Sequence, residues 1–154
     1  MALHVYSKDV NDNYVLHSED GAQTKPIITV HHGRDGTTQE IELYVRADDE
    51  GSYSNIQITA TTSGADDIGW GDSRGTTGWG VKLMVDAGIT PTETDWAALE
   101  YGNTIDITDI TSSSDVRTFW YRLESPRNIS VQMKQNISLQ LLYTVSGPAP
   151  IVVT

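Results

Sequence analysis

Residues that could bind a metal ion are few in this chain, and they form no complete metal-binding motif. Asp9, Asn11 and Asn13 place oxygen atoms at alternate positions, which is the spacing that begins a calcium-binding loop. An EF-hand, however, requires glycine where Tyr14 stands and glutamate where Asp20 stands. No helix is expected on either side of this segment. We therefore interpret it as a polar turn, with adventitious calcium binding as the alternative.

Catalytic and cofactor motifs give no better candidates. The neighbours His31 and His32 would point to opposite faces of a strand, so they are poorly placed to share one ion. The sequence has no cysteine, which excludes disulfides, thiolate metal sites and cysteine nucleophiles. It has no Gly-x-Ser-x-Gly elbow, and the glycine-rich stretch around Trp70 lacks the Lys-Ser/Thr pair of a phosphate loop. We predict no cofactor, no metal site and no enzymatic activity; a hydrolase is an alternative for which no residues can be named.

The four tryptophans are the residues best suited to contact a partner. Trp70 and Trp79 each lie between two glycines, in or beside a long predicted loop of residues 63–80. Trp120 lies on the polar side of a predicted strand. We expect Trp120 to be covered by this loop or by a short helix. The alternatives are a subunit contact and a sugar-stacking platform formed by Trp70 and Trp79.

These residues are positioned by segments in which apolar residues recur at every second position. Period two means that one face of a strand is apolar and the other polar, because successive side chains point to opposite faces. The segments are 41–45, 56–60, 81–85, 119–123 and 137–145. Clusters of Gly, Asp, Asn, Ser and Thr separate them. We therefore predict an all-β fold, an antiparallel β-sandwich of Ig-like or jelly-roll-like type.

Two shorter patterns add a hairpin and a helix to this prediction. Residues 27–31 and 40–46 are predicted to pair, because the Asp-Gly sequence between them favours a tight hairpin turn. The sequence Thr-Pro-Thr-Glu that begins at Thr90 has the form of a capping box, with Thr90 as N-cap and Glu93 reaching back. We therefore predict one short helix near residues 91–99.

Length and charge limit the organisation and the partners of the chain. Its 154 residues are expected to form an N-terminal arm or edge segment (1–25), a sandwich domain (26–146) and an extended C-terminal tail (147–154). The net charge of −11 disfavours direct nucleic-acid binding, because that affinity comes largely from Lys and Arg. No apolar run is long enough for a membrane span, and no secretory signal is visible, so we expect synthesis in a cytoplasm.

The stretch of residues 78–107 carries the most distinctive combination of residues. It contains Trp79-Gly80-Val81-Lys82-Leu83, then Gly88-Ile89-Thr90-Pro91-Thr92-Glu93, Trp96 and Gly102-Asn103-Thr104-Ile105. Leu43-Tyr44-Val45-Arg46-Ala47-Asp48-Asp49 precedes it, and Phe119-Trp120-Tyr121-Arg122 and Ser125-Pro126-Arg127 follow it. Together these segments, which span residues 40–145, resemble small virion proteins of tailed bacteriophages.

This resemblance implies a non-enzymatic structural protein with a β-sandwich fold. It implies first an auxiliary capsid protein, of the decoration or cement type, that binds and stabilises the head lattice through the major capsid protein or other virion proteins. A tail, fibre or baseplate component is the alternative within the virion, and a carbohydrate-binding β-sandwich is the alternative from another class. A homo-oligomer located in the virion, after synthesis in the host cytoplasm, agrees with the same resemblance.

The candidate partner contacts come from the tryptophans and from the C-terminal tail. They are Trp70, Trp79, Trp120, Ile151, Val152 and Val153. The tail residues are apolar and β-branched, so they are suited to pair as a strand with a neighbouring subunit.

Overall fold

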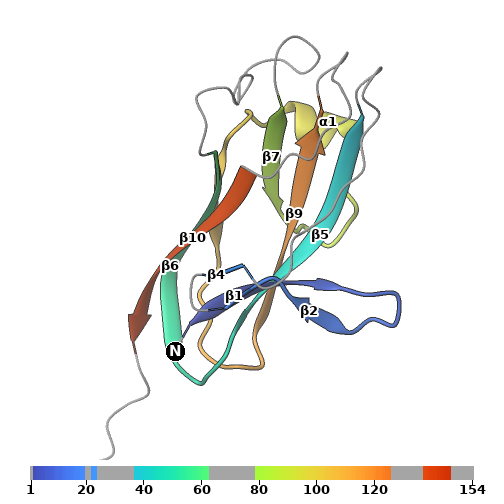
Figure 1. Cartoon of the computed structure of the whole chain (residues 1–154). Helices are drawn as coiled ribbons and strands as arrows, with labels where there is room; N and C mark the ends of the chain where they lie inside the picture. The colour runs from blue at the N-terminus through green and yellow to red at the C-terminus, as the bar shows by residue number, and fades with distance from the viewer. Residues whose placement is uncertain (1, 20–21, 24–36, 63–78, 126–136, 147–154) are drawn as a thin grey trace, which may run out of the picture.

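The computed structural model describes residues 2–19, 22–23, 37–62, 79–125 and 137–146, which form two antiparallel sheets and one short helix (Figure 1). The large sheet has the strand order β2-β1-β5-β9-β7, and the small sheet has the order β10-β6-β8. The strands of the large sheet are β1 (Leu3–Lys8), β2 (Tyr14–Leu16), β5 (Thr38–Ala47), β7 (Gly80–Val85) and β9 (Val116–Glu124). Those of the small sheet are β6 (Ser52–Thr62), β8 (Thr104–Ile107) and β10 (Ile137–Ser146), and β3 (Ser18–Glu19) pairs separately with β4 (Ala22–Gln23).

One hydrophobic core lies between the two sheets. The pairing register places Leu43 opposite Phe119, and all of the surface of these two side chains is buried. The small sheet contributes Ile56, Ile58 and Ala60 of β6 and Ile105 and Ile107 of β8, which alternate as period two requires, and also Tyr53, which lies outside this alternation. The predicted antiparallel β-sandwich is therefore confirmed. Val85 and Val145 are exceptions to the predicted core, because they lie at the ends of β7 and β10 and are 44% and 43% exposed.

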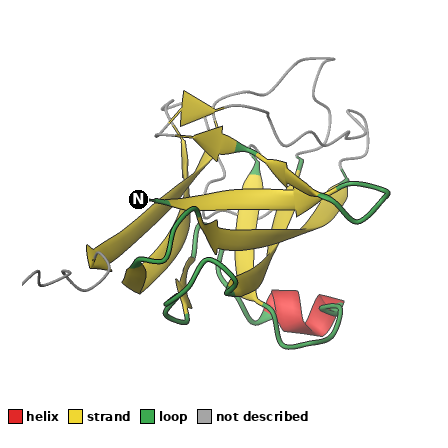
Figure 2. Cartoon of the chain, turned by 90° about the horizontal axis from the view of Figure 1, so that it is seen from below, coloured by secondary structure: helices red, strands yellow, loops and turns green. Residues whose placement is uncertain are grey.

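The predicted short helix is present as α1 (Glu93–Ala97), and it lies to one side of the sheets (Figure 2). Its N-cap, however, is Thr92 rather than Thr90. The Thr92 hydroxyl accepts the Asp95 N–H, and the Asp95 carboxylate accepts the Thr92 N–H at 2.8 Å. The prediction was wrong by two residues because Thr90 and Thr92 are both good caps, and only the fold decides which one begins the helix.

The N-terminal segment belongs to the sandwich rather than forming a separate arm. Strand β1 lies inside the large sheet, between β2 and β5, and its Leu3 and Val5 are buried in the core. Asp48 joins this strand to the turn after β5: its carboxylate accepts the Ala2 N–H at 2.8 Å and lies 3.2 Å from the His4 ring nitrogen. Of the two expectations for residues 1–25, an arm or an edge segment, the described residues include an edge strand, β2, and the boundary expected near residue 26 lies outside the described residues.

We expect these contacts to make the stability of the protein sensitive to acid. The hydrogen bond from the Ala2 N–H, and secondarily the one from His4, lower the pKa of Asp48 below its ordinary value of 3.8. A carboxylate with a lowered pKa stabilises the fold above its unfolded pKa, and this contribution is lost as pH falls through the folded pKa. We expect Asp48→Asn to lower the free energy of unfolding at neutral pH by about 0.5–1 kcal/mol, because the side chain is 38% exposed and screened.

The measurement is urea unfolding between neutral pH and pH 2, with wild type and Asp48→Asn compared. The difference between the two proteins should shrink as pH falls below 3.8. A difference that stays constant through the acid range would contradict this role of Asp48.

Several predictions fall on residues outside the described part of the chain. They concern the first half of the predicted 27–31/40–46 hairpin, the adjacent histidines, Trp70 and the tail 147–154. The second half of that hairpin lies in β5, which pairs with β1 and β9. No helix in the described residues is long and apolar enough to cross a membrane.

Candidate functional site

The outward face of the large sheet gathers polar, charged and aromatic side chains from all of its strands. Because inward and outward positions alternate, the even-numbered residues of β1, β5, β7 and β9 share this face. Three groups lie on it: a tyrosine cluster over β1, β2 and β5, a tryptophan at the middle of β9, and an arginine cluster beneath α1. We call this surface the outward face.

The tyrosine cluster comprises Tyr6, Tyr14, Tyr44, Lys8 and Arg46. Tyr14 packs edge-on against both other tyrosines, with ring centroids 5.9 Å from Tyr6 and 5.5 Å from Tyr44. The Lys8 ammonium lies 4.9 Å from the Tyr44 centroid, and the Arg46 guanidinium lies 4.3 Å from the Tyr14 centroid. Such cation–π contacts hold the rings in a fixed arrangement. The pairings Tyr6–Tyr44 and Lys8–Tyr14 bring the cluster together across three strands.

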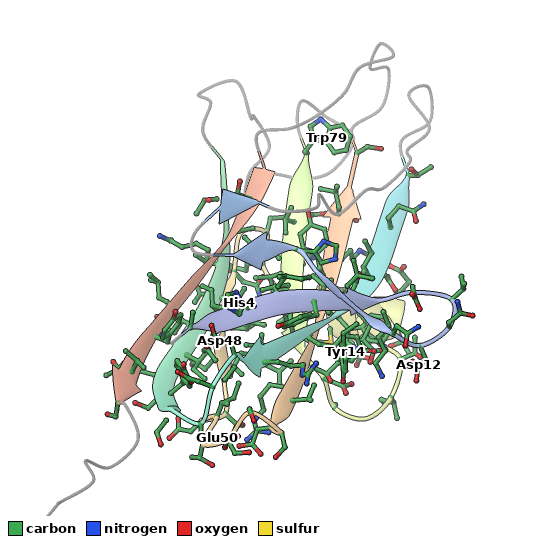
Figure 3. The ribbon with its side chains drawn as sticks, turned by 60° about the horizontal axis from the view of Figure 1, so that its bottom comes forward. His4, Asp12, Tyr14, Asp48, Glu50 and Trp79 are labelled. Carbon is green, nitrogen blue, oxygen red and sulfur yellow. The ribbon has the colours of Figure 1, made fainter. Side chains whose placement is uncertain are left out.

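The cluster is suited to contact rather than to proton transfer. The Tyr44 hydroxyl donates to a Glu42 carboxylate oxygen at 3.0 Å. Burial, and then this hydrogen bond, raise the pKa of Tyr44 to about 12, so the phenol stays protonated at neutral pH. Tyr14 is 37% exposed and lies by Asp12 at the end of the β1–β2 hairpin, away from Trp79 (Figure 3). An accessible ring on a fixed support can add contact area to a partner.

The turn at residues 9–13, between β1 and β2, is stabilised by the carboxylate of its first residue, Asp9. One Asp9 carboxylate oxygen accepts the N–H groups of Asn11 and Asn13, each at 2.9 Å. The Asp9 N–H donates to the Asn13 carbonyl at 2.9 Å. This is the geometry of a polar Asx turn. Within the described residues, no group of three or more His, Cys, Asp or Glu side chains is arranged to hold a metal ion.

Trp120 is the tryptophan that the fold places on the outward face. It lies between Glu42 of β5 and Met84 of β7, and its indole N–H donates to Asp86 at 3.4 Å. The ring remains partly exposed. Trp79, in contrast, packs against the core between the sheets. The structure therefore does not bring these two tryptophans together, and Trp70 lies outside the described residues.

A shallow apolar groove of about 460 Å³ includes Met84, the residue of β7 that lies opposite Trp120. It runs between the end of β7 and α1, and Met84, Val85, Ile89, Pro91 and Leu99 contribute its apolar lining. Ile89 is 67% exposed. The sequence does not predict this groove, because one of its walls comes from α1 and the other from β7, which precedes the helix in the chain.

An arginine cluster attaches α1 to the outward face. The buried Arg122 guanidinium donates to both carboxylate oxygens of Glu93 at 3.0 and 3.1 Å, and also to Glu40 at 3.0 Å and Glu124 at 3.1 Å. Burial alone would lower the pKa of Arg122, but hydrogen bonds to Glu93 and Glu124 raise it above its ordinary value. The guanidinium is therefore a permanent positive charge that joins β5, β9 and α1. The sequence does not reveal this role, because Glu40 and Glu93 are far from Arg122 in the chain.

A second buried cation supports the helix from β7. The Lys82 ammonium donates to the Trp96 carbonyl at 3.0 Å and lies 4.4 Å from the Tyr101 ring centroid. Trp96 is the buried residue of α1, and its ring lies 5.6 Å from the Arg122 guanidinium. These two cations are used inside the protein. Among the described residues of the outward face, the exposed rings and the groove are accessible to a partner.

The outward face therefore combines partly exposed aromatic rings, an apolar groove and fixed charges. Aromatic residues are enriched at the energetically important centres of protein interfaces, and flat rings also stack on sugars. Comparison with models of known families, with curated proteins and with solved structures finds no match to this chain.

Proposed function

We propose that this chain is a non-enzymatic structural protein of a tailed-phage virion. The role that we favour is that of an auxiliary capsid protein, of the decoration or cement type, which binds the major capsid protein and stabilises the head lattice. Two features support this proposal. The all-β sandwich-like fold agrees with the one that the sequence resemblance implies, and the outward face presents the partly exposed rings of Tyr14 on β2 and Trp120 on β9, together with an apolar groove at the β7 edge. The single observation that carries it is this partly exposed aromatic surface.

The physical basis is burial of aromatic and apolar surface, repeated over many copies. A few buried aromatic anchors supply most of the free energy of a protein interface. On a symmetric lattice, weak single contacts become strong when several are linked. The net charge of −11 would keep the remaining surface hydrated and the decorated particle soluble.

The first test is immunogold electron microscopy of phage particles from the source lysate, with antibody against the purified chain. Regular label over the heads is expected. Label confined to the tail would move the protein to the tail, fibre or baseplate class. Intact and opened particles that both lack label would contradict a virion role.

The second test measures which surface binds. We expect Trp120→Ala or Tyr14→Ala to weaken binding to undecorated heads about tenfold or more, since such anchors contribute at least about 1.4–2 kcal/mol each. Copies bound per head are counted by quantitative gel analysis after sedimentation. Thr104→Ala, at an exposed position of β8 in the small sheet, is the matched control and should bind as wild type does. Equal binding of all variants would place the contact elsewhere.

Carbohydrate binding is the second candidate, because the same exposed rings offer flat apolar faces. A glycan ligand would quench tryptophan fluorescence. Trp120→Ala would abolish this change, whereas substitution of Trp79, which packs against the core, would leave the change in place. A glycan screen without a binder would remove this candidate.

A further inference from the structure

The edges of the two sheets differ in how well they are protected against pairing with another strand. Exposed edge strands offer unpaired N–H and C=O groups, and proteins protect them by keeping them short, charged or covered. Strands β2 and β8, at two of the edges, have 3 and 4 residues. Strand β7, at a third edge, is covered: the Asn103 side chain bonds both the N–H and the carbonyl of Leu83 at 2.8 Å.

Strand β10, at the fourth edge, lacks most of this protection. It has 10 residues and, within the described part of the chain, pairs with β6 alone. Its sequence, ISLQLLYTVS, contains no charged residue and no proline. A register shift lies between Leu142 and Thr144, but the segment before it is regular. Strand β10 borders the fold on the left in Figure 3.

The occupant that best suits this edge is a second copy of the same chain. Two copies that each carry a net charge of −11 repel one another, and this repulsion is weakest where the approaching surfaces carry no charge. Strand β10 meets this condition, and its Leu142 is 50% exposed on the outer side of the small sheet. An antiparallel edge is also self-complementary, because a two-fold axis pairs the strand with its own copy.

We infer that two copies pair through β10, antiparallel, to form one continuous sheet with the order β8-β6-β10-β10-β6-β8. The two-fold axis passes near Gln140, at the middle of the charge-free regular segment, so that this residue faces its own copy. Main-chain hydrogen bonds supply the attraction, and the Leu142 side chains lose exposed surface on the same face. This pairing does not depend on the proposed virion role, because it uses the small sheet and leaves the outward face accessible.

The first experiment measures the mass of the full chain in solution by sedimentation velocity over a range of concentrations. Wild type is expected at twice the 16.9 kDa mass of one chain. Gln140→Glu, which is nearly isosteric, would place two carboxylates opposite one another and raise the dimer dissociation constant about tenfold or more. Gln39→Glu, at an exposed position of β5, adds the same charge elsewhere and should remain dimeric. Circular dichroism and thermal unfolding verify that both variants fold.

The second experiment uses the absence of cysteine from the natural sequence. In Gln140→Cys, the two thiols would lie directly opposite each other and form a disulfide-linked dimer on mild oxidation, because facing residues of paired strands bring their Cβ atoms within about 4.5–5.5 Å. Gln39→Cys should give little such product. A monomeric wild type at all concentrations would overturn the inference. The inference would also be overturned if Gln140→Glu left the dimer intact and Gln140→Cys gave no more disulfide-linked dimer than Gln39→Cys.

Discussion

Replacing Arg122 by alanine is expected to lower the free energy of unfolding by about 3–5 kcal/mol. The side chain is 8% exposed and lies within 3.1 Å of carboxylate oxygens of Glu40, Glu93 and Glu124. Its removal leaves three negative charges close together, and the side chain of Glu124 is itself 5% exposed. A buried charge that loses its partner costs far more than the pair contributes when intact.

The measurement is urea unfolding followed by tryptophan fluorescence and circular dichroism. Arg122→Lys keeps the charge but cannot bond both oxygens of Glu93, so it should lose an intermediate amount. Lys8→Ala removes a cation from the same face, where the side chain is 29% exposed, and should cost only about 0.5–1 kcal/mol. If Arg122→Ala cost no more than Lys8→Ala, the arginine cluster would not hold the helix to the sheet.

Replacing Trp96 by alanine is expected to cost about 3–5 kcal/mol as well, because it leaves a large cavity under the helix. Trp96 is 1% exposed and is the buried residue of α1. Without it, the helix loses its buried apolar anchor, while the polar contacts from Lys82 and Arg122 remain. The groove wall that α1 contributes would then loosen, so the binding that we propose for the outward face should weaken together with stability.

Trp96→Phe is the matched control for this prediction. The Trp96 indole N–H is buried and has no hydrogen-bond partner within the described residues, so its removal costs little. Phenylalanine keeps most of the apolar ring volume. The free energy of unfolding should therefore fall by about 2 kcal/mol less in Trp96→Phe than in Trp96→Ala. A double-mutant cycle of Trp96→Ala with Arg122→Ala should show coupling, because the two side chains are in contact. Additive losses would mean that they stabilise the helix independently.

Alternation in the sequence predicts strands β5, β6, β7, β9 and β10 and most of the core residues that they contribute. Alternation at Leu43, Val45 and Phe119 predicted which face of each strand is buried, because side-chain direction along a strand is a local property. The end residues Val85 and Val145 follow the same alternation and yet are exposed, since the opposing sheet does not cover them. The helix was likewise predictable in position, although not in its first residue.

The tertiary structure alone decided which strands are neighbours and therefore which side chains form the outward face. Tyr14, Tyr44 and Arg46 meet because β1 lies between β2 and β5, and nothing in the local sequence requires that order. Arg122 meets Glu93 across 29 residues and Glu40 across 82 for the same reason. Pairing between strands is set by non-local contacts summed over the whole core, whereas period two is set by the geometry of each strand.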